Sequence, residues 1–305
     1  MIERKNDFLS LDNMFEMFIT EKKIRGLASV TLDDYKFSYG VLKEYLGEKE
    51  INKLEYTKFV EHLMDTKNIP SVNRRISDTR VFLYWCMDNE YINRFKINKI
   101  KQQEEKIRFF TDEELKKLLV EPSKDCFYVE YRTWVMICFI LATGCRISTL
   151  INIKIEDIDM NAKTIDLRHL KNKKYKCLPL VDSIVCVVRN YLRTWDITSE
   201  YLFCTNDGEK LTVNACEIAM SKYCKARKVN RRGYHALRHN FARQYIKNGG
   251  NAFTLQQMLC HSGIEMTRKY VKLFSEDIRN DVTKCNPLDT LRPIRTTIAR
   301  KQCHN

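Results

Sequence analysis

The chain has 305 residues, of which 53 are Lys or Arg and 39 are Asp or Glu, so its formal charge is +14. Hydrophobic residues make up 44%, and 9 Gly and 5 Pro are too few for a collagen-like, low-complexity or disordered protein. The longest apolar run, 134–142, is far shorter than the ~20 residues of a membrane span, and the first residues lack a signal-peptide pattern. We therefore expect a soluble, cytoplasmic, mainly helical protein of about two domains.

Twelve cysteines occur in the chain, but no two of them form a CxxC pair, and no Cys/His group has the spacing of a zinc site. Without an export signal, these thiols are expected to stay reduced. Cys138, Cys186 and Cys216 lie in apolar stretches, where cysteine acts as a small hydrophobic residue. The sequence predicts neither disulfides nor a bound metal.

Positive charge is concentrated in the second part of the chain. Residues 1–100 have a net charge of about +1, and residues 101–305 about +13. The window 221–250 contains no acidic residue but nine basic ones, namely Lys222, Lys225, Arg227, Lys228, Arg231, Arg232, Arg238, Arg243 and Lys247. Such a concentration is typical of a protein that binds a polyanion, although a solvated charged face is the alternative. The helical core pattern between the charges disfavours a membrane-surface anchor.

The first hundred residues have the spacing of short amphipathic helices. Apolar residues at three- and four-residue steps predict helices over 11–23, 29–46, 54–64 and 72–91. Gly47 is a suitable stop for the second helix. The fourth helix is expected to bury Ile76, Val81, Phe82, Trp85 and Cys86. Residues 1–100 are therefore predicted to form a helical domain.

The apolar periodicity is lost over 93–106, which predicts a polar linker, placed at 101–110, before a second domain at 111–285. Thr111 and Glu114 form a capping-box pattern at the first helix of that domain. An apolar helix over 127–143 follows and stops at Gly144. Alternating residues predict strands of a small antiparallel sheet at 151–158, 164–167 and 177–181. Further helices are expected over 184–195, 214–228, 235–247, 255–260 and 266–274, before an aperiodic tail at 286–305.

Three sequence patches combine residues suited to phosphate chemistry. They are ATGCRISTL at 142–150 with Arg146, HALRHNFA at 235–242 with His235 and Arg238, and LCHSGIEMTRKY at 259–270. In a helix His235 and Arg238 share a face, apart from the apolar stripe, so both are expected to point outward. The arginine guanidinium matches phosphate oxygens, and a nearby tyrosine can act as a nucleophile.

In order and spacing, Arg146, the HxxR pair and the segment from His261 to Tyr270 resemble the tyrosine recombinase (phage integrase) family. The resemblance covers most of the chain and implies a helical DNA-binding domain at 1–100 and a catalytic domain at 111–285. It implies that Arg146 and Arg238 hold the scissile phosphate and that Tyr270 attacks it, leaving a 3′-phosphotyrosyl link. His235 would assist as general base and His261 as a hydrogen-bond donor to the phosphate. His239 is expected to be structural.

The family also has a lysine in a β-hairpin that protonates the leaving 5′-oxygen. In HLKNKKYKCLPL, at 169–180, Lys171 best matches that position, and Lys173 is the alternative. Further basic residues of the hairpin and of the stretch 222–232 are candidate DNA-phosphate contacts. The candidates for this role are Lys173, Lys174, Lys176, Lys222, Lys225, Arg227, Lys228, Arg231 and Arg232.

Two positions depart from the family pattern. Thr149 stands where the family usually has an acid, and Cys260 stands where it usually has the Gly before the third-motif His. Residue 260 is accordingly expected to adopt an ordinary helical or turn conformation. Neither departure changes the phosphate clamp or the nucleophile, so the enzyme is expected to be active.

The resemblance implies double-stranded DNA sites as substrate, a tetramer on DNA in which the tail at 286–305 docks on a neighbouring protomer, and no metal or ATP. The compact chain is more like Xer-type recombinases, or the integrases of transposons and conjugative elements, than like lambda-type integrases. It is expected in the cytoplasm at the nucleoid, with an accessory DNA-bending protein or a second recombinase as optional partners. The alternatives are a catalytically idle DNA-binding relative and a type IB topoisomerase-like relaxing enzyme.

Overall fold

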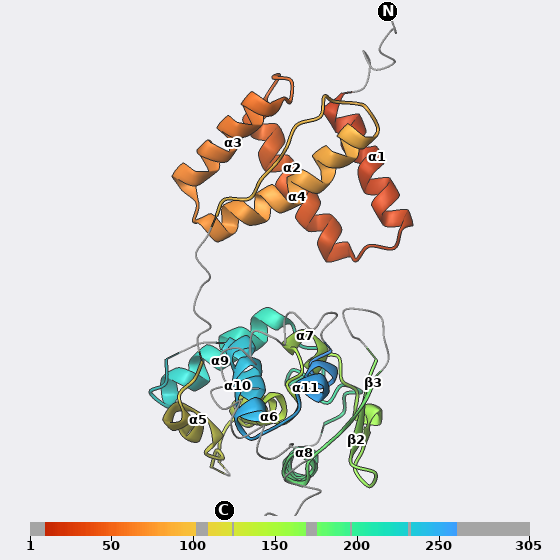
Figure 1. The fold of residues 1–305 in the computed structure, drawn as a ribbon. Helices are drawn as coiled ribbons and strands as arrows, with labels where there is room; N and C mark the ends of the chain where they lie inside the picture. Colours follow the sequence, from red (N-terminus) through yellow and green to blue (C-terminus); the bar gives the residue numbers. More distant parts are fainter. Residues whose placement is uncertain are drawn as a thin grey trace, which may run out of the picture. The chain divides into compact units, whose positions relative to one another are not determined.

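The computed structural model describes residues 10–101, 109–123, 125–168, 176–195, 197–230 and 233–260. The chain divides into two compact units, residues 1–105 and 106–305, which we describe separately (Figure 1). The described part is mainly helical, with one small antiparallel sheet, which confirms the predicted fold class. None of its helices has the length and apolar character that crossing a bilayer would need.

The first unit is a four-helix arrangement with an aromatic core. Its helices are α1 (Leu11–Ile24), α2 (Ser29–Leu46), α3 (Lys53–Thr66) and α4 (Ile69–Asp88). Side chains of Ser10, Asn52 and Asn68 cap the amino ends of α1, α3 and α4, which explains where these helices begin. Phe18 and Phe82 lie in the core, the latter as predicted. Val81 does not: it is 37% exposed, because the buried stripe of α4 passes through its neighbours Phe82 and Leu83.

The segment 93–101 has no helix or strand, yet it belongs to the first unit. Ile97 is buried in the helical core, and its backbone N–H donates to the Tyr84 hydroxyl at 3.2 Å. The Asn73 side chain pairs with both backbone groups of Ile100, at 2.9 and 3.0 Å. The interpretation of 93–100 as linker composition was therefore wrong. Backbone groups of this segment form hydrogen bonds with side chains of the first unit, and not with a neighbouring strand or within a helix.

The second unit contains the helices α5 (Asp112–Leu119), α6 (Tyr128–Thr143), α7 (Ile147–Leu150), α8 (Asp182–Thr194), α9 (Val213–Ala226), α10 (Gly233–Lys247) and α11 (Ala252–Met258). Thr111 and Glu114 form the predicted capping box at α5. Phe110, assigned to the linker by sequence, is fully buried in the core of this unit.

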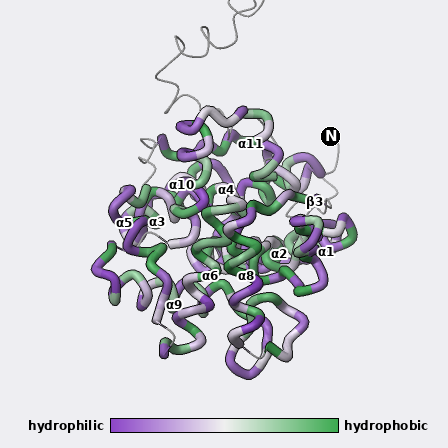
Figure 2. Tube along the Cα trace, turned by 90° about the horizontal axis from the view of Figure 1, so that it is seen from below, coloured by the Kyte–Doolittle hydropathy of each residue, from purple (hydrophilic) through white to green (hydrophobic). Residues whose placement is uncertain are grey.

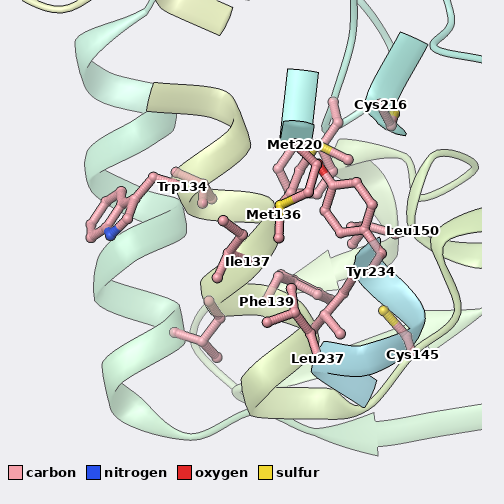
Figure 3. Packing of buried hydrophobic residues seen from close by; sticks show 14 of the residues in the cluster. Trp134, Met136, Ile137, Phe139, Cys145, Leu150, Cys216, Met220, Tyr234 and Leu237 are labelled. Atoms are coloured by element: carbon pink, nitrogen blue, oxygen red, sulfur yellow. The ribbon is translucent and has the colours of Figure 1, made fainter. Parts of the chain in front are cut away.

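Helix α6 is the centre of the second unit and packs against α8, α9 and α10. Hydrophobic residues line it along most of its length (Figure 2). Tyr234 and Leu237 of α10 lie beside Met136 and Phe139 of α6 in the close-up view (Figure 3). A helix that is apolar on most faces needs partners on most sides, which explains its central place.

The sheet has the order β1-β2-β3, with β1 (Ile158–Asp159), β2 (Thr164–Leu167) and β3 (Lys176–Pro179) all antiparallel. The predicted strand over 151–158 is wrong except at its last residue, because a turn and a 3₁₀ helix (Ile155–Asp157) occupy most of it. Its alternation has another cause. The backbones of Ile153 and Ile155 pair with Leu202 and Glu200, each at 2.9 Å, outside the three-stranded sheet.

The ten cysteines in the described ranges are free thiols. Cys216 is buried and Cys138 partly buried, as expected for small apolar residues. Cys186 is exposed, which contradicts the prediction for it. The buried stripe of α8 includes its neighbour Val185 and leaves residue 186 on the solvent side.

Candidate active site

The first element of the site is the end of α6. Gly144 ends this helix in the left-handed conformation, with φ of +67°, and its N–H donates to the Ile140 carbonyl at 2.8 Å. Glycine favours this conformation because it has no Cβ. Arg146 follows two residues later as the residue before the short helix α7, and it is partly buried.

Helix α10 supplies Arg238, whose guanidinium joins three segments of the chain. The side chain is only 3% exposed; it donates to the Gly144 carbonyl at 2.6 Å and to the Leu259 carbonyl at 2.7 Å. The prediction that Arg238 points outward with His235 was therefore wrong. Residues three apart on a helix differ by about 60° in direction, which lets His235 stay exposed while Arg238 lies between α6 and the end of α11.

His235 lies in the positive field of both arginines. Desolvation of its imidazole by neighbouring protein atoms, followed by the charges of Arg238 and Arg146, lowers the His235 pKa below its usual value. The His235 ring stands edge-on to His239, with ring centroids 4.4 Å apart. Burial, His235 and Arg238 lower the pKa of His239 to about 4. Both imidazoles are therefore neutral at pH 7, so each has a ring nitrogen that can accept a proton.

The structure thus brings Arg146, His235 and Arg238 into one electrostatic neighbourhood. The other candidates of the reaction, Lys171, His261 and Tyr270, lie outside the described residues, as do the DNA-contact candidates Lys173, Lys174, Arg231 and Arg232.

The described DNA-contact candidates differ in their surroundings. Lys222, Lys225 and Lys228 are exposed on and just after α9. Arg227 instead forms an ion pair with Glu130 at 3.1 Å and stacks on the Tyr223 ring at 3.6 Å from its centroid, which makes it poorly suited to a DNA phosphate. The Lys176 ammonium donates to the Gln257 carbonyl and so connects β3 with α11.

The two departures from the family pattern also have defined structures. Thr149 is buried in α7, and its N–H donates to the Arg146 carbonyl at 2.9 Å. Cys260 has φ of +51°, so the expected ordinary helical or turn conformation was wrong. It follows the end of α11, where a residue in the left-handed conformation terminates the helix.

The sequence analysis missed the contribution of Asn240. Its fully buried amide accepts from the Phe110 N–H at 2.9 Å and donates to the Phe110 carbonyl at 2.7 Å. This pair connects the beginning of the second unit to α10, two residues after Arg238. A polar residue in the first turns of a helix that is otherwise apolar on that side was the available signal, since buried amides are normally paired.

Comparisons with known proteins agree with the geometry. The model of the phage integrase family matches residues 108–276. Tyrosine recombinase XerC of Staphylococcus aureus is 26% identical over 297 residues, covering 91% of this chain and 97% of that protein. Tyrosine recombinase XerA of Pyrococcus furiosus is 27% identical over 227 residues, covering 73% of this chain and 77% of that protein.

Solved structures share the fold at low sequence identity. A lambda integrase dimer bound to a COC′ core site has a TM-score of 0.70 at 17% identity, covering 86% of this chain and 77% of that chain. The Tn1549 transposon integrase in complex with a circular intermediate DNA also has a TM-score of 0.70 at 17% identity, covering 84% and 94%. Since the family match spans more than half of the sequence, the chain belongs to the phage integrase family of tyrosine recombinases.

Proposed function

We propose that this protein is a site-specific DNA recombinase that cuts and rejoins DNA strands through a 3′-phosphotyrosyl intermediate on Tyr270. Its biological role would be the integration or excision of a mobile element, or the resolution of replicons. The observation that carries the proposal is the convergence of Arg146, which follows α6, with His235 and Arg238 of α10, two separate segments within the matched region. Two guanidinium groups beside a neutral imidazole suit a phosphodiester that gains negative charge as it reacts.

In the proposed reaction, Arg146 and Arg238 bind the non-bridging oxygens of the scissile phosphate. The Tyr270 oxygen attacks phosphorus, the bond to the 5′-oxygen breaks, and the phosphate stays linked to the 3′-carbon and the tyrosine. The neutral His235 accepts the phenolic proton, since its low pKa leaves it unprotonated at pH 7. Lys171 protonates the leaving 5′-oxygen, and His261 donates a hydrogen bond to the phosphate.

We further propose that the substrate is double-stranded DNA bound by both units, with four protomers at the crossover. The supporting relatives are a lambda integrase tetramer bound to a Holliday junction and a XerH recombinase bound to a difH substrate. In this proposal residues 1–100 form a DNA-binding domain, 111–285 the catalytic domain, and the tail at 286–305 docks on a neighbouring protomer. The exposed Lys222, Lys225 and Lys228 contact DNA phosphates.

A covalent-capture assay tests this proposal. The protein is incubated with a nicked attachment-site DNA that loses its 5′-hydroxyl strand after cleavage, and a protein–DNA adduct is resolved by denaturing electrophoresis. We expect an adduct with the unaltered chain, its loss in Tyr270→Phe, and its retention in the control Tyr201→Phe, which makes the same chemical change at a residue that has no role in the proposed reaction. No adduct on a site that the protein binds would support the idle DNA-binding relative. Relaxation of plasmids without the site would support the topoisomerase-like enzyme.

A further inference from the structure

The turn that follows α11 holds a cysteine in a backbone conformation that glycine prefers. Cys260 has φ of +51°, and its N–H donates to the Gln257 carbonyl at 3.0 Å, while the Leu259 N–H donates to Leu255 at 2.9 Å. A side chain with a Cβ is strained in this left-handed region, whereas glycine populates it freely. The backbone at residue 260 therefore adopts a conformation that cysteine disfavours.

Leu259, the residue before this cysteine, is held by contacts of both its side chain and its carbonyl. Its side chain is fully buried in a small cluster with Phe241 and Leu255. One of its methyl carbons lies 2.8 Å from the place that a Cβ of Gly144 would occupy. Its carbonyl accepts a hydrogen bond from Arg238 at 2.7 Å. Leu259 thus connects the end of α11 to both the end of α6 and the buried guanidinium.

The φ angle of residue 260 directly controls where that carbonyl points. The Leu259 C=O and the Cys260 N–H belong to one rigid peptide plane, whose orientation depends on ψ of residue 259 and φ of residue 260. If the backbone on both sides of this peptide keeps its place, relaxation of Cys260 from φ of +51° to an ordinary φ near −60° requires an opposite change in ψ of Leu259, and the peptide plane rotates by about 110°. Because the buried side chain fixes the position of the Leu259 Cα, this rotation turns the carbonyl away from Arg238.

We propose that Cys260 is a positioning residue for Arg238, acting through the Leu259 carbonyl. Its left-handed conformation directs this carbonyl to the guanidinium, and its strain limits how firmly Arg238 is held. The inference rests on the proposed function, in which Arg238 binds the scissile phosphate. The backbone conformation at residue 260, and not the thiol, then determines how firmly Arg238 is held in position to bind the phosphate.

The test is a series at position 260 ranked by tolerance of positive φ: Cys260→Gly, Cys260→Asn and Cys260→Val. The first readout is hydrogen exchange of the Arg238 guanidinium protons in the full chain without DNA, followed by NMR and assigned with Arg238→Lys. We expect exchange about fivefold slower in Cys260→Gly and slower also in Cys260→Asn, because the strain relieved by glycine is of that size. The second readout is single-turnover strand cleavage at saturating DNA.

In cleavage, we expect Cys260→Gly and Cys260→Asn to be at least as fast as the unaltered chain. Cys260→Val should be at least about tenfold slower with unchanged DNA affinity, since a β-branched residue strongly disfavours positive φ. Glu90→Gly is the matched control. Residue 90 has φ of +61° after α4 and donates to the Met87 carbonyl at 3.2 Å, the same local geometry in the first unit. This control should change neither readout.

The outcomes separate the two proposals. Absence of covalent product from the unaltered chain and from all three variants refutes the proposed function, while the exchange readout still tests the positioning role. Arg238 exchange that is the same in Cys260→Gly, Cys260→Asn and the unaltered chain overturns the inference even when cleavage is normal. Cleavage that follows side-chain size or the presence of a thiol, with Cys260→Asn slow and Cys260→Val fast, overturns it as well.

Discussion

Replacing Gly144 with alanine tests how closely α10 and α11 are fitted to the end of α6. A Cβ at this position would lie 2.4 and 2.7 Å from two ring carbons of Phe241 and 2.8 Å from a methyl carbon of Leu259. Overpacking of this kind costs about 1–3 kcal/mol. The φ of +67° adds about 1 kcal/mol for a residue with a Cβ. We therefore expect Gly144→Ala to lower the free energy of unfolding of the second unit by about 2–4 kcal/mol.

Gly208→Ala isolates the backbone contribution in the same unit. Gly208 has φ of +79°, but its Cβ would meet only ordinary contacts, the nearest at 3.5 Å from the Thr198 hydroxyl. Urea unfolding of both variants, followed by a spectroscopic signal of the second unit, gives the difference. We expect Gly144→Ala to be less stable than Gly208→Ala by at least about 1 kcal/mol. Equal stabilities would refute the reasoning, because the steric contribution at Gly144 would then be absent.

Three further predictions concern polar groups near the site. The His239 pKa of about 4 lies below the unfolded value, so the unfolded chain binds more protons between these values and stability falls as the pH is lowered. The free energy of unfolding, measured with urea, should therefore decrease from pH 7 to pH 5. We expect this decrease to be about 1–2 kcal/mol smaller in His239→Gln than in the unaltered chain. Within the described part of the chain the buried Tyr234 hydroxyl has no hydrogen-bond partner, so Tyr234→Phe should keep or raise the melting temperature. Tyr191→Phe should lower it, because that hydroxyl pairs with another tyrosine at 2.8 Å. Asn240→Asp should cost about 2 kcal/mol or more in denaturant unfolding, since a carboxylate cannot donate to the Phe110 carbonyl, and an unchanged midpoint would contradict the role of this pair.

Helices were predictable where local rules decide them. The capping box at Thr111 and the stop at Gly144 use only neighbouring residues, and both agree with the structure. The predictions were wrong for segments whose structure depends on residues distant in the sequence. Ile97 is buried because Tyr84, 13 residues away, binds its backbone, and Ile153 is extended because Leu202 pairs with it. No periodicity within a segment reports such partners.

The candidate site divides in the same way. The order of Arg146, His235 and Arg238 predicts that they contribute to one site, and in the structure the charges of both arginines act on His235. The burial of Arg238 was not predictable from its helix alone, because the face of α10 that is covered depends on α6 and on the chain after α11. The conformation of Cys260 depends likewise on how Leu259 is held from outside its own turn.

These contacts explain why an arginine at position 238 suits both the fold and the chemistry. Carbonyls at the ends of α6 and α11 lack helical partners, and helix carboxyl ends have partial negative charge. A planar guanidinium can donate to Gly144 and Leu259 at once, whereas a lysine ammonium lacks this forked geometry. The same positive charge that neutralises two helix ends then stands next to His235 and Arg146. The proposed phosphate clamp therefore includes a residue that packs the second unit, and we expect changes that loosen this packing to reduce strand cleavage before they abolish DNA binding.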